Sequence, residues 1–346
     1  MLTRSKKLIR AKEYAKKAIL SEIVAIRSSK ELRKFLEHSQ LNEQVASVVQ
    51  VFAVELHATN ATFPHLRTIL SLLHGITDLV MNIPVRYAAH LSSALHFANL
   101  TSLSTTLPHS MIATLLHNHP RITTLVLGPC STPRKCPLRA IQLPEASELS
   151  GPPGCLAGLV GNNPVREVTA TYRGPRDAQY PLHLLFNFMP LNTSVNLTVL
   201  HVDFRPSDVD MLLRVAAAAP RLVSLKLTEN IFLKPADHLK ARLLWREPSK
   251  WVEAFNLLPC LQNLLLKTFH SLAYGADDEA ETIRRWLSVV KPMGTHPHPA
   301  LRHIVVWWSA EIEGGCLGVW DLVNGLWSRT YAATAEPGGG LDEAFV

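Results

Sequence analysis

The chain has 346 residues, 47% of them hydrophobic, which is enough to bury a large core in one extended or two compact domains. Its formal charge of +7 is concentrated at the start: residues 1–34 hold 11 Lys/Arg and 3 acidic residues, and the remaining 312 hold 24 and 25. The nearly neutral body argues against a large nucleic-acid-binding surface. No apolar run reaches the roughly 18 residues of a membrane span, and no signal-peptide core follows the basic start.

Residues 1–29 form a basic leader in which we predict a helix, because residues 6–26 lack Pro and Gly. The apolar residues that share one face of this helix are Leu8, Ile19, Ile23 and Ile26. One interpretation is a solvated helix that packs on the first part of the following domain. The alternative is a helix that mediates membrane association or organelle targeting.

One apolar pattern recurs along the chain: an apolar residue, a second three positions later and a third two positions after that. The last step puts two side chains on one face of a short strand. The copies are Ile76-Leu79-Met81, Leu100-Leu103-Thr105, Ile122-Leu125-Leu127, Leu197-Leu200-Val202, Leu222-Leu225-Leu227, Leu261-Leu264-Leu266 and Leu301-Ile304-Val306.

Helix signals precede several copies. We predict helices over 64–74, 108–119 and 206–219, each of which begins with a proline, a residue favoured in the first helical turn. Each unit is therefore expected to consist of a helix, a stop and a short strand. Two weaker copies, Leu138-Ile141-Leu143 and Val165-Val168-Ala170, fill the middle of the chain.

The spacing of these strands indicates the fold class. Most intervals between successive strands are near the 20–29 residues of leucine-rich repeats, and no glycine-rich phosphate-binding turn is found. We predict an α/β fold, an irregular leucine-rich-repeat solenoid whose curved parallel sheet carries helices on its convex side. The repeat domain is expected to span 30–330, with a loop-rich insert at 129–164 and a flexible tail at 331–346.

Two segments near the end carry further expectations. The acids Asp277-Asp278-Glu279 suit the start of a helix, which is predicted to end near Lys291. The tryptophans Trp307-Trp308, Trp320 and Trp327 gather in the same region. They are interpreted either as a cap that covers the last repeat or as an aromatic hot spot for a partner.

No catalytic or metal-binding motif emerges from the reactive residues. The five cysteines are scattered without a CxxC pair, which favours reduced thiols. His117-Asn118-His119 ends a predicted helix with no metal-ligand partner in sight, and His296 and His298 do not complete a zinc site. We therefore expect no enzymatic activity, no metal and no cofactor, in a cytoplasmic or nuclear protein.

Residues from about 30 to 310 resemble the leucine-rich-repeat portion of fungal, especially basidiomycete, F-box-type proteins. The resemblance is carried by the Pro-x-Leu-x-x-Leu-x-Leu units and by three segments, Ser29–Leu36, Val45–Leu56 and Leu149–Pro153. It implies a substrate receptor of a cullin-RING ubiquitin ligase. In that family an N-terminal F-box docks the adaptor subunit, so an adaptor partner is expected only if an F-box lies upstream of the repeats.

Residues that alternate with the buried pair on each strand are expected to face the concave side and to hold a protein partner. No nucleic acid and no membrane is expected there. The residues predicted to bind the partner are Asp78, Asn82, Thr124, His201, Asp203, Lys226, Thr228, Asn263, Lys267, His303 and Trp307.

Overall fold

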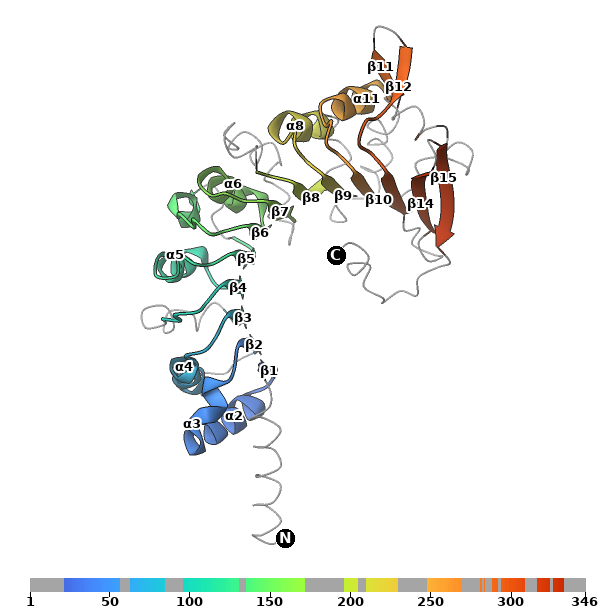
Figure 1. Ribbon diagram of the computed structural model, residues 1–346. Helices are drawn as coiled ribbons and strands as arrows, with labels where there is room; N and C mark the ends of the chain where they lie inside the picture. Colours follow the sequence, from blue (N-terminus) through green and yellow to red (C-terminus); the bar gives the residue numbers. More distant parts are fainter. Residues whose placement is uncertain are drawn as a thin grey trace, which may run out of the picture. The chain divides into compact units, whose positions relative to one another are not determined.

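The computed structural model shows an α/β protein that divides into two compact units, Met1–Pro164 and Val165–Val346, where the sequence predicts a single repeat domain. Each unit is built on an open, mostly parallel sheet (Figure 1). The structure describes residues 22–56, 63–84, 96–130, 135–171, 196–204, 210–229, 248–268, 281, 283, 288–291, 294–308, 316–323 and 326–332.

The sheet of the first unit consists of parallel strands whose order follows the chain. They are β1 (Ile23–Ile26), β2 (Val51–Glu55), β3 (Asp78–Asn82), β4 (Ser102–Thr105), β5 (Thr124–Leu127) and β6 (Glu148–Gly151). Parallel neighbours require a crossover between strands. The helices of these crossovers are α2 (Ser29–Leu41), α3 (Glu43–Ser47), α4 (Phe63–Leu72), α5 (His109–His117) and the 3₁₀ helix η4 (Pro137–Ala140), with α6 (Pro153–Asn162) after the last strand. Figure 1 shows α4, α5 and α6 on one side of the strands.

The second unit repeats this arrangement and then changes strand direction. Its parallel strands are β7 (Glu167–Ala170), β8 (Val199–Phe204), β9 (Ser224–Glu229), β10 (Asn263–Thr268) and β13 (His303–Trp308), with helices α8 (Met211–Ala218) and α11 (Pro248–Asn256). Two antiparallel strands, β14 (Cys316–Val323) and β15 (Leu326–Ala332), extend the sheet beyond β13. A separate hairpin pairs β11 (Ser288–Lys291) with β12 (Gly294–Pro297).

A buried apolar column runs across each sheet. In the first unit the strands pair so that one residue of each falls in register, and these residues are Phe52, Leu79, Leu103, Leu125 and Leu149, none of them more than 1% exposed. In the second unit the equivalent column is Val168, Leu200, Leu225, Leu264 and Ile304, all fully buried. Burying one such side chain contributes about 1.5–3 kcal/mol, so a register slip, which would expose a whole column, is strongly disfavoured.

A ladder of hydroxyl groups accompanies the column in the first unit. Just before β3, β4, β5 and β6, a Thr or Ser hydroxyl donates to the carbonyl oxygen of the residue that precedes the neighbouring, earlier strand. The donors Thr77, Thr101, Thr123 and Ser147 lie 3.2–3.3 Å from their acceptors. The backbone N–H groups of the same residues bond to the same carbonyls, at 2.8–2.9 Å. The N–H of the next residue bonds to the same carbonyl at 3.0–3.1 Å, so three donors to one acceptor fix the turn into each of these strands.

A second recurring device is a buried polar side chain directly before a proline. His119 donates from Nδ1 to its own helix at Leu115 O (2.6 Å). At Nε2 it accepts from the N–H of Phe97, which lies before β4 (2.8 Å). Asn163 has the same double role, accepting from Leu143 N–H and donating to Leu159 O (2.7 Å).

His298 performs this task in the second unit. Its Nε2–H reaches Phe255 O and Leu258 O at 3.2 and 3.1 Å, and its Nδ1 accepts from Leu301 N–H at 3.0 Å. Such contacts satisfy backbone groups that helix ends leave without partners. His119 and His298, which the sequence does not predict to bind a metal, thus have structural roles.

Helices predicted over 64–74, 108–119 and 206–219 are confirmed as α4, α5 and, in the described part from Asp210, α8. The strand predicted at Leu138-Ile141-Leu143 is wrong, because Pro137 opens the helix η4 there. The strand in this part of the chain is β6, and its copy of the apolar pattern is Ala146, Leu149 and Gly151. The region predicted as a loop-rich insert, 129–164, therefore holds β6 and α6.

Three expectations at the ends and edges also need correction. The leader helix predicted over 6–26 does not extend to its end, since Ile23–Ile26 is the strand β1, paired with β2; residues 1–21 lie outside the described part. The helix predicted to end near Lys291 meets the strand β11, and the acids at 277–279 are not described. The predicted tail starts too early, because β15 continues to Ala332.

Among the described residues, the helices are too short or too polar for any of them to cross a bilayer.

The His119 contact predicts a pH-dependent stability. Burial lowers the pKa of His119 from 6.5, so below about pH 6.5 the unfolded chain takes up a proton that the folded chain excludes, and the first unit loses stability as the pH falls. In His119→Gln the free energy of unfolding should drop by about 1–3 kcal/mol at pH 8, since two buried backbone groups lose a fitted partner. The further loss between pH 6.5 and 5 should shrink.

Hydrogen exchange of peptides covering residues 97–119, followed from pH 8 to 5, measures both effects. The control is His117→Gln, at an exposed histidine two positions away, which should leave exchange unchanged. Equal behaviour of the two variants would contradict the role assigned to His119.

Candidate functional site

The candidate site is the side of the strands whose residues alternate with the buried columns, which we call the open face. On the strands β3 to β10 these residues are exposed or half-buried, as a period of two requires. All the residues predicted to bind a partner lie at such positions or at the equivalent ones on β13. One neighbour departs from the pattern, since Val305 on β13 is only 5% exposed.

The side chains on the open face of the first unit are small and mostly uncharged. One row across the strands is Ala25, Ala53, Val80, Ser104, Val126 and Ser150. Acidic groups border this row at three of the strands, as Glu55 on β2, Asp78 on β3 and Glu148 on β6. Thr124 donates to Glu148 Oε2 (3.2 Å). The Asn82 side chain, at the end of β3, donates to Glu55 (3.4 Å). This face offers few charged or aromatic anchors.

The open face of the second unit carries larger and charged side chains. One row is Thr169, His201, Lys226, Leu265, Val305 and Val319. The next row holds Asp203, Thr228, Lys267 and Trp307. Cations, imidazoles, an acid and an indole thus lie on adjacent strands at the spacing of strands, about 4.8 Å.

The Lys267 ammonium group stacks on the indole of Trp307, 3.8 Å from the ring centroid. These two residues are register partners on β10 and β13, so the sheet itself brings them together. A cation above an indole face is attracted by the ring quadrupole. The contact holds a large aromatic surface in place on the open face.

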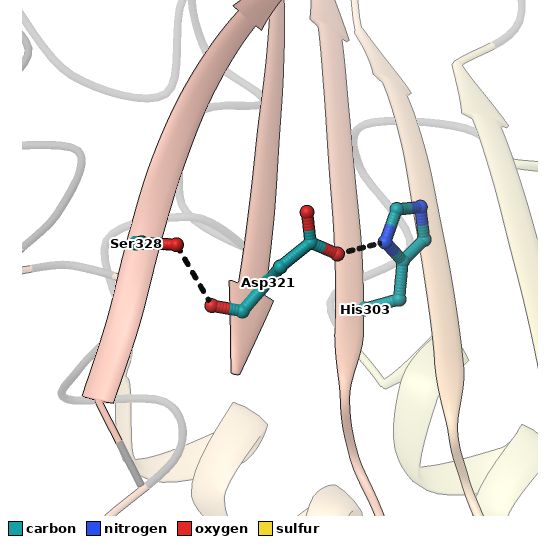
Figure 2. A network of polar contacts seen from close by, with 3 residues as sticks. All are labelled: His303, Asp321 and Ser328. Atoms are coloured by element: carbon teal, nitrogen blue, oxygen red, sulfur yellow. Dashed lines mark hydrogen bonds and ion pairs between the residues drawn. The ribbon is translucent and has the colours of Figure 1, made fainter. Parts of the chain in front are cut away.

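Figure 2 shows the polar network at the edge where β13 meets β14. His303 Nδ1 lies 2.6 Å from Asp321 Oδ1, and Ser328 Oγ donates to the main-chain oxygen of Asp321 at 3.5 Å. A serine protease-like relay would need the hydroxyl on the imidazole. Here the Ser328 hydroxyl bonds to the Asp321 backbone instead. The Asp321 carboxylate therefore orients the His303 ring, and the network does not pair a nucleophile with a base.

The sequence analysis did not name Asp321 as part of the site. It reaches His303 only because β14 runs antiparallel to β13, and the repeat pattern predicts parallel strands alone. Thr169 was missed as well, although its hydroxyl lies 3.3 Å from His201 Nδ1 and the weak copy Val165-Val168-Ala170 places it on the open face.

Metal-ligand chemistry lies elsewhere, in a cluster of the first unit formed by His109, Cys130, Cys136 and Cys155. Burial lowers the pKa of His109, but contacts with the sulfurs of Cys130 and Cys136 outweigh burial and raise this pKa to about 9. Hydrogen bonds with Cys136 and Cys155 lower the pKa of the Cys130 thiol, and hydrogen bonds with Cys130 and Cys136 raise the pKa of the Cys155 thiol.

No protein-family model matches the chain, and no curated protein matches it with significance.

The Lys267–Trp307 contact can be measured by a double-mutant cycle. Lys267→Met keeps the aliphatic stem and removes the charge, and Trp307→Leu keeps an apolar side chain and removes the ring. We expect a coupling free energy of about 0.5–2 kcal/mol from urea unfolding of the two single variants and the double variant. Strictly additive effects would show that the ammonium group does not interact with the indole in solution.

Proposed function

We propose that this protein is a non-enzymatic scaffold for protein–protein interaction, and that the open face of its second unit holds the partner. The observation that carries the proposal is the arrangement of Lys226, Lys267, Trp307 and His303 on adjacent in-register strands. Tryptophan is a residue type that dominates binding energy at protein interfaces, and a rim of charges around it confers specificity.

The first unit is better suited to a structural role in the scaffold than to binding a partner. Its open face is built of Ala, Ser and Val with acids at the side, so it offers no comparable anchor. A regular parallel sheet also suits a rigid platform, because every strand is fixed to its neighbours along its length. The proposed division of labour is that the first unit supports the fold and the second one binds the partner.

We further propose that the fold is an irregular leucine-rich-repeat solenoid. In-register strands in chain order, one crossover per strand and a buried apolar column are properties of such solenoids. The proposal extends the resemblance to fungal F-box-type proteins, in which the repeats hold the substrate of a ubiquitin ligase. Binding of a cullin-ligase adaptor then depends on an F-box upstream of the repeats.

The test uses two triple variants with the same change in charge. Asp203→Ala, Lys226→Ala and Lys267→Ala remove charges from the open face of the second unit. Arg166→Ala, Arg221→Ala and Glu253→Ala remove exposed charges of the same unit that lie before strands or in α11. Proximity labelling in the native cell, quantified for each protein, should lose a specific partner by at least tenfold in the open-face variant, equivalent to about 1.4 kcal/mol.

The control variant should keep that partner within twofold, and circular dichroism should show both variants folded. The proposal is contradicted if the two triple variants lose the same proteins, or if the open-face variant loses none. Trp307→Ala provides an independent check, with an expected cost of about 2 kcal/mol or more in the affinity for the partner so identified.

A further inference from the structure

Four side chains with metal-ligating atoms converge inside the first unit, away from the open face. The ring of His109 and the sulfurs of Cys130, Cys136 and Cys155 each offer one atom, and these atoms all lie within 4.8 Å of one another. His109 Nδ1 lies 3.2 Å from Cys136 Sγ. Tetrahedral zinc, with Zn–S of about 2.3 Å and Zn–N of about 2.0 Å, separates its ligand atoms by about 3.5–3.8 Å. To reach this geometry, pairs as far apart as 4.8 Å would close by about 1 Å and the His109–Cys136 pair would open by about 0.3 Å.

Separate elements deliver the ligands to one point. His109 is the first residue of α5, and Cys130 follows the end of β5. Cys136 immediately precedes η4, and Cys155 lies in the first turn of α6. The positive end of the α6 dipole favours a thiolate at Cys155.

The backbone around the cluster holds the imidazole in one orientation. His109 Nε2 lies 3.3 Å from the carbonyl oxygen of Gly128, so its N–H donates there and leaves Nδ1 to face the sulfurs. Histidine ligands of metals characteristically donate their second ring N–H to a carbonyl or carboxylate. A side chain at Gly128 would come within 2.7 Å of Thr106 Cα, so glycine is required for this close approach.

Two more glycines bring the last ligand into place. Gly151, at the end of β6, has a φ of +154°, a conformation that glycine adopts readily, and it turns the chain toward α6. At Gly158 a Cβ would lie 2.6 Å from Arg139 Cα, so α6 packs against η4 at backbone contact. This contact sets the distance between Cys155 on α6 and Cys136 at the start of η4.

We propose that His109, Cys130, Cys136 and Cys155 bind one structural zinc ion. Three thiolates and an imidazole form a soft N/S ligand set that selects zinc over calcium or magnesium. All the ligands are protein side chains at most 9% exposed, so the site is closed and has no position for a substrate. The ion would hold α5, β5, η4 and α6 together. The helices of this part of the chain are short, at most ten residues.

The test measures metal in the full chain, produced with zinc and purified under reducing conditions. Wild type should retain about one equivalent of zinc, and Cys136→Ser and Cys155→Ser should lose at least 90% of it. The matched control is Cys260→Ser, at an exposed free cysteine of the second unit, which should keep the ion. Zinc-free wild type, or equal zinc in the Cys155 and Cys260 variants, would overturn the assignment.

Cobalt substitution identifies the ligands. The wild-type protein loaded with Co²⁺ should show the intense visible bands of a tetrahedral site and a thiolate-to-cobalt charge-transfer band. In His109→Ala the charge-transfer band should persist while the visible bands shift, because the three thiolates remain and the imidazole is lost. An unchanged spectrum in this variant would remove His109 from the ligand set and overturn the four-ligand site.

A measurement on wild type alone covers the case in which the cysteine variants do not fold. Stepwise mercurial titration of the zinc-loaded protein should release the ion as three thiols react. Modification of all five thiols without zinc release contradicts the proposal. So does a disulfide between two of these three cysteines in protein that was purified without reductant and exposed to zinc.

Discussion

The in-register pairing of parallel strands around a buried apolar column is the constraint on which the rest of each unit depends. Each strand that pairs in parallel points the same way as its neighbour, so the chain has to cross back before each new parallel strand. The crossover helices have ends with backbone groups that need partners, and these ends are packed inside. The buried polar residues His119, Asn163 and His298 meet that need, and the hydroxyls before the strands fix the turns that lead into the sheet.

The same register that buries one set of residues determines which side chains stand together on the open face. In the first unit the resulting rows contain Ala, Ser and Val, and in the second they contain lysines, imidazoles and Trp307. The change in direction at β14 adds Asp321 beside His303. The proposed binding face of the second unit therefore consists of residues that are far apart in sequence and adjacent in the sheet.

The sequence predicts strands best where Leu occupies all the apolar positions, as at Leu222-Leu225-Leu227. It fails at Leu138-Ile141-Leu143, because apolar spacing alone cannot exclude a short helix, and Pro137 starts one. The copy of the pattern that does form a strand, Ala146-Leu149-Gly151, has only small, weakly apolar residues at both ends. Its Ser147, equivalent to Thr77 and Thr123, is the signal that would have found it, since the hydroxyl ladder marks the entry to each strand of the first unit after β2.

The cysteine cluster could not be read from spacing. Its members are separated by 21, 6 and 19 positions, unlike the short CxxC pairs of common zinc motifs, and only the alignment of successive units brings them together. The open-face residues, in contrast, follow directly from a period of two. Tertiary register thus decides what local periodicity leaves open.

Site-specific photo-cross-linking tests the central claim, that the open face of the second unit holds a protein partner, most directly. A photoreactive phenylalanine analogue at Thr228, on the open face, should cross-link the partner in intact cells, and the same analogue at Glu253 on α11 should not. Cross-links from Glu253 with none from Thr228 would contradict the account.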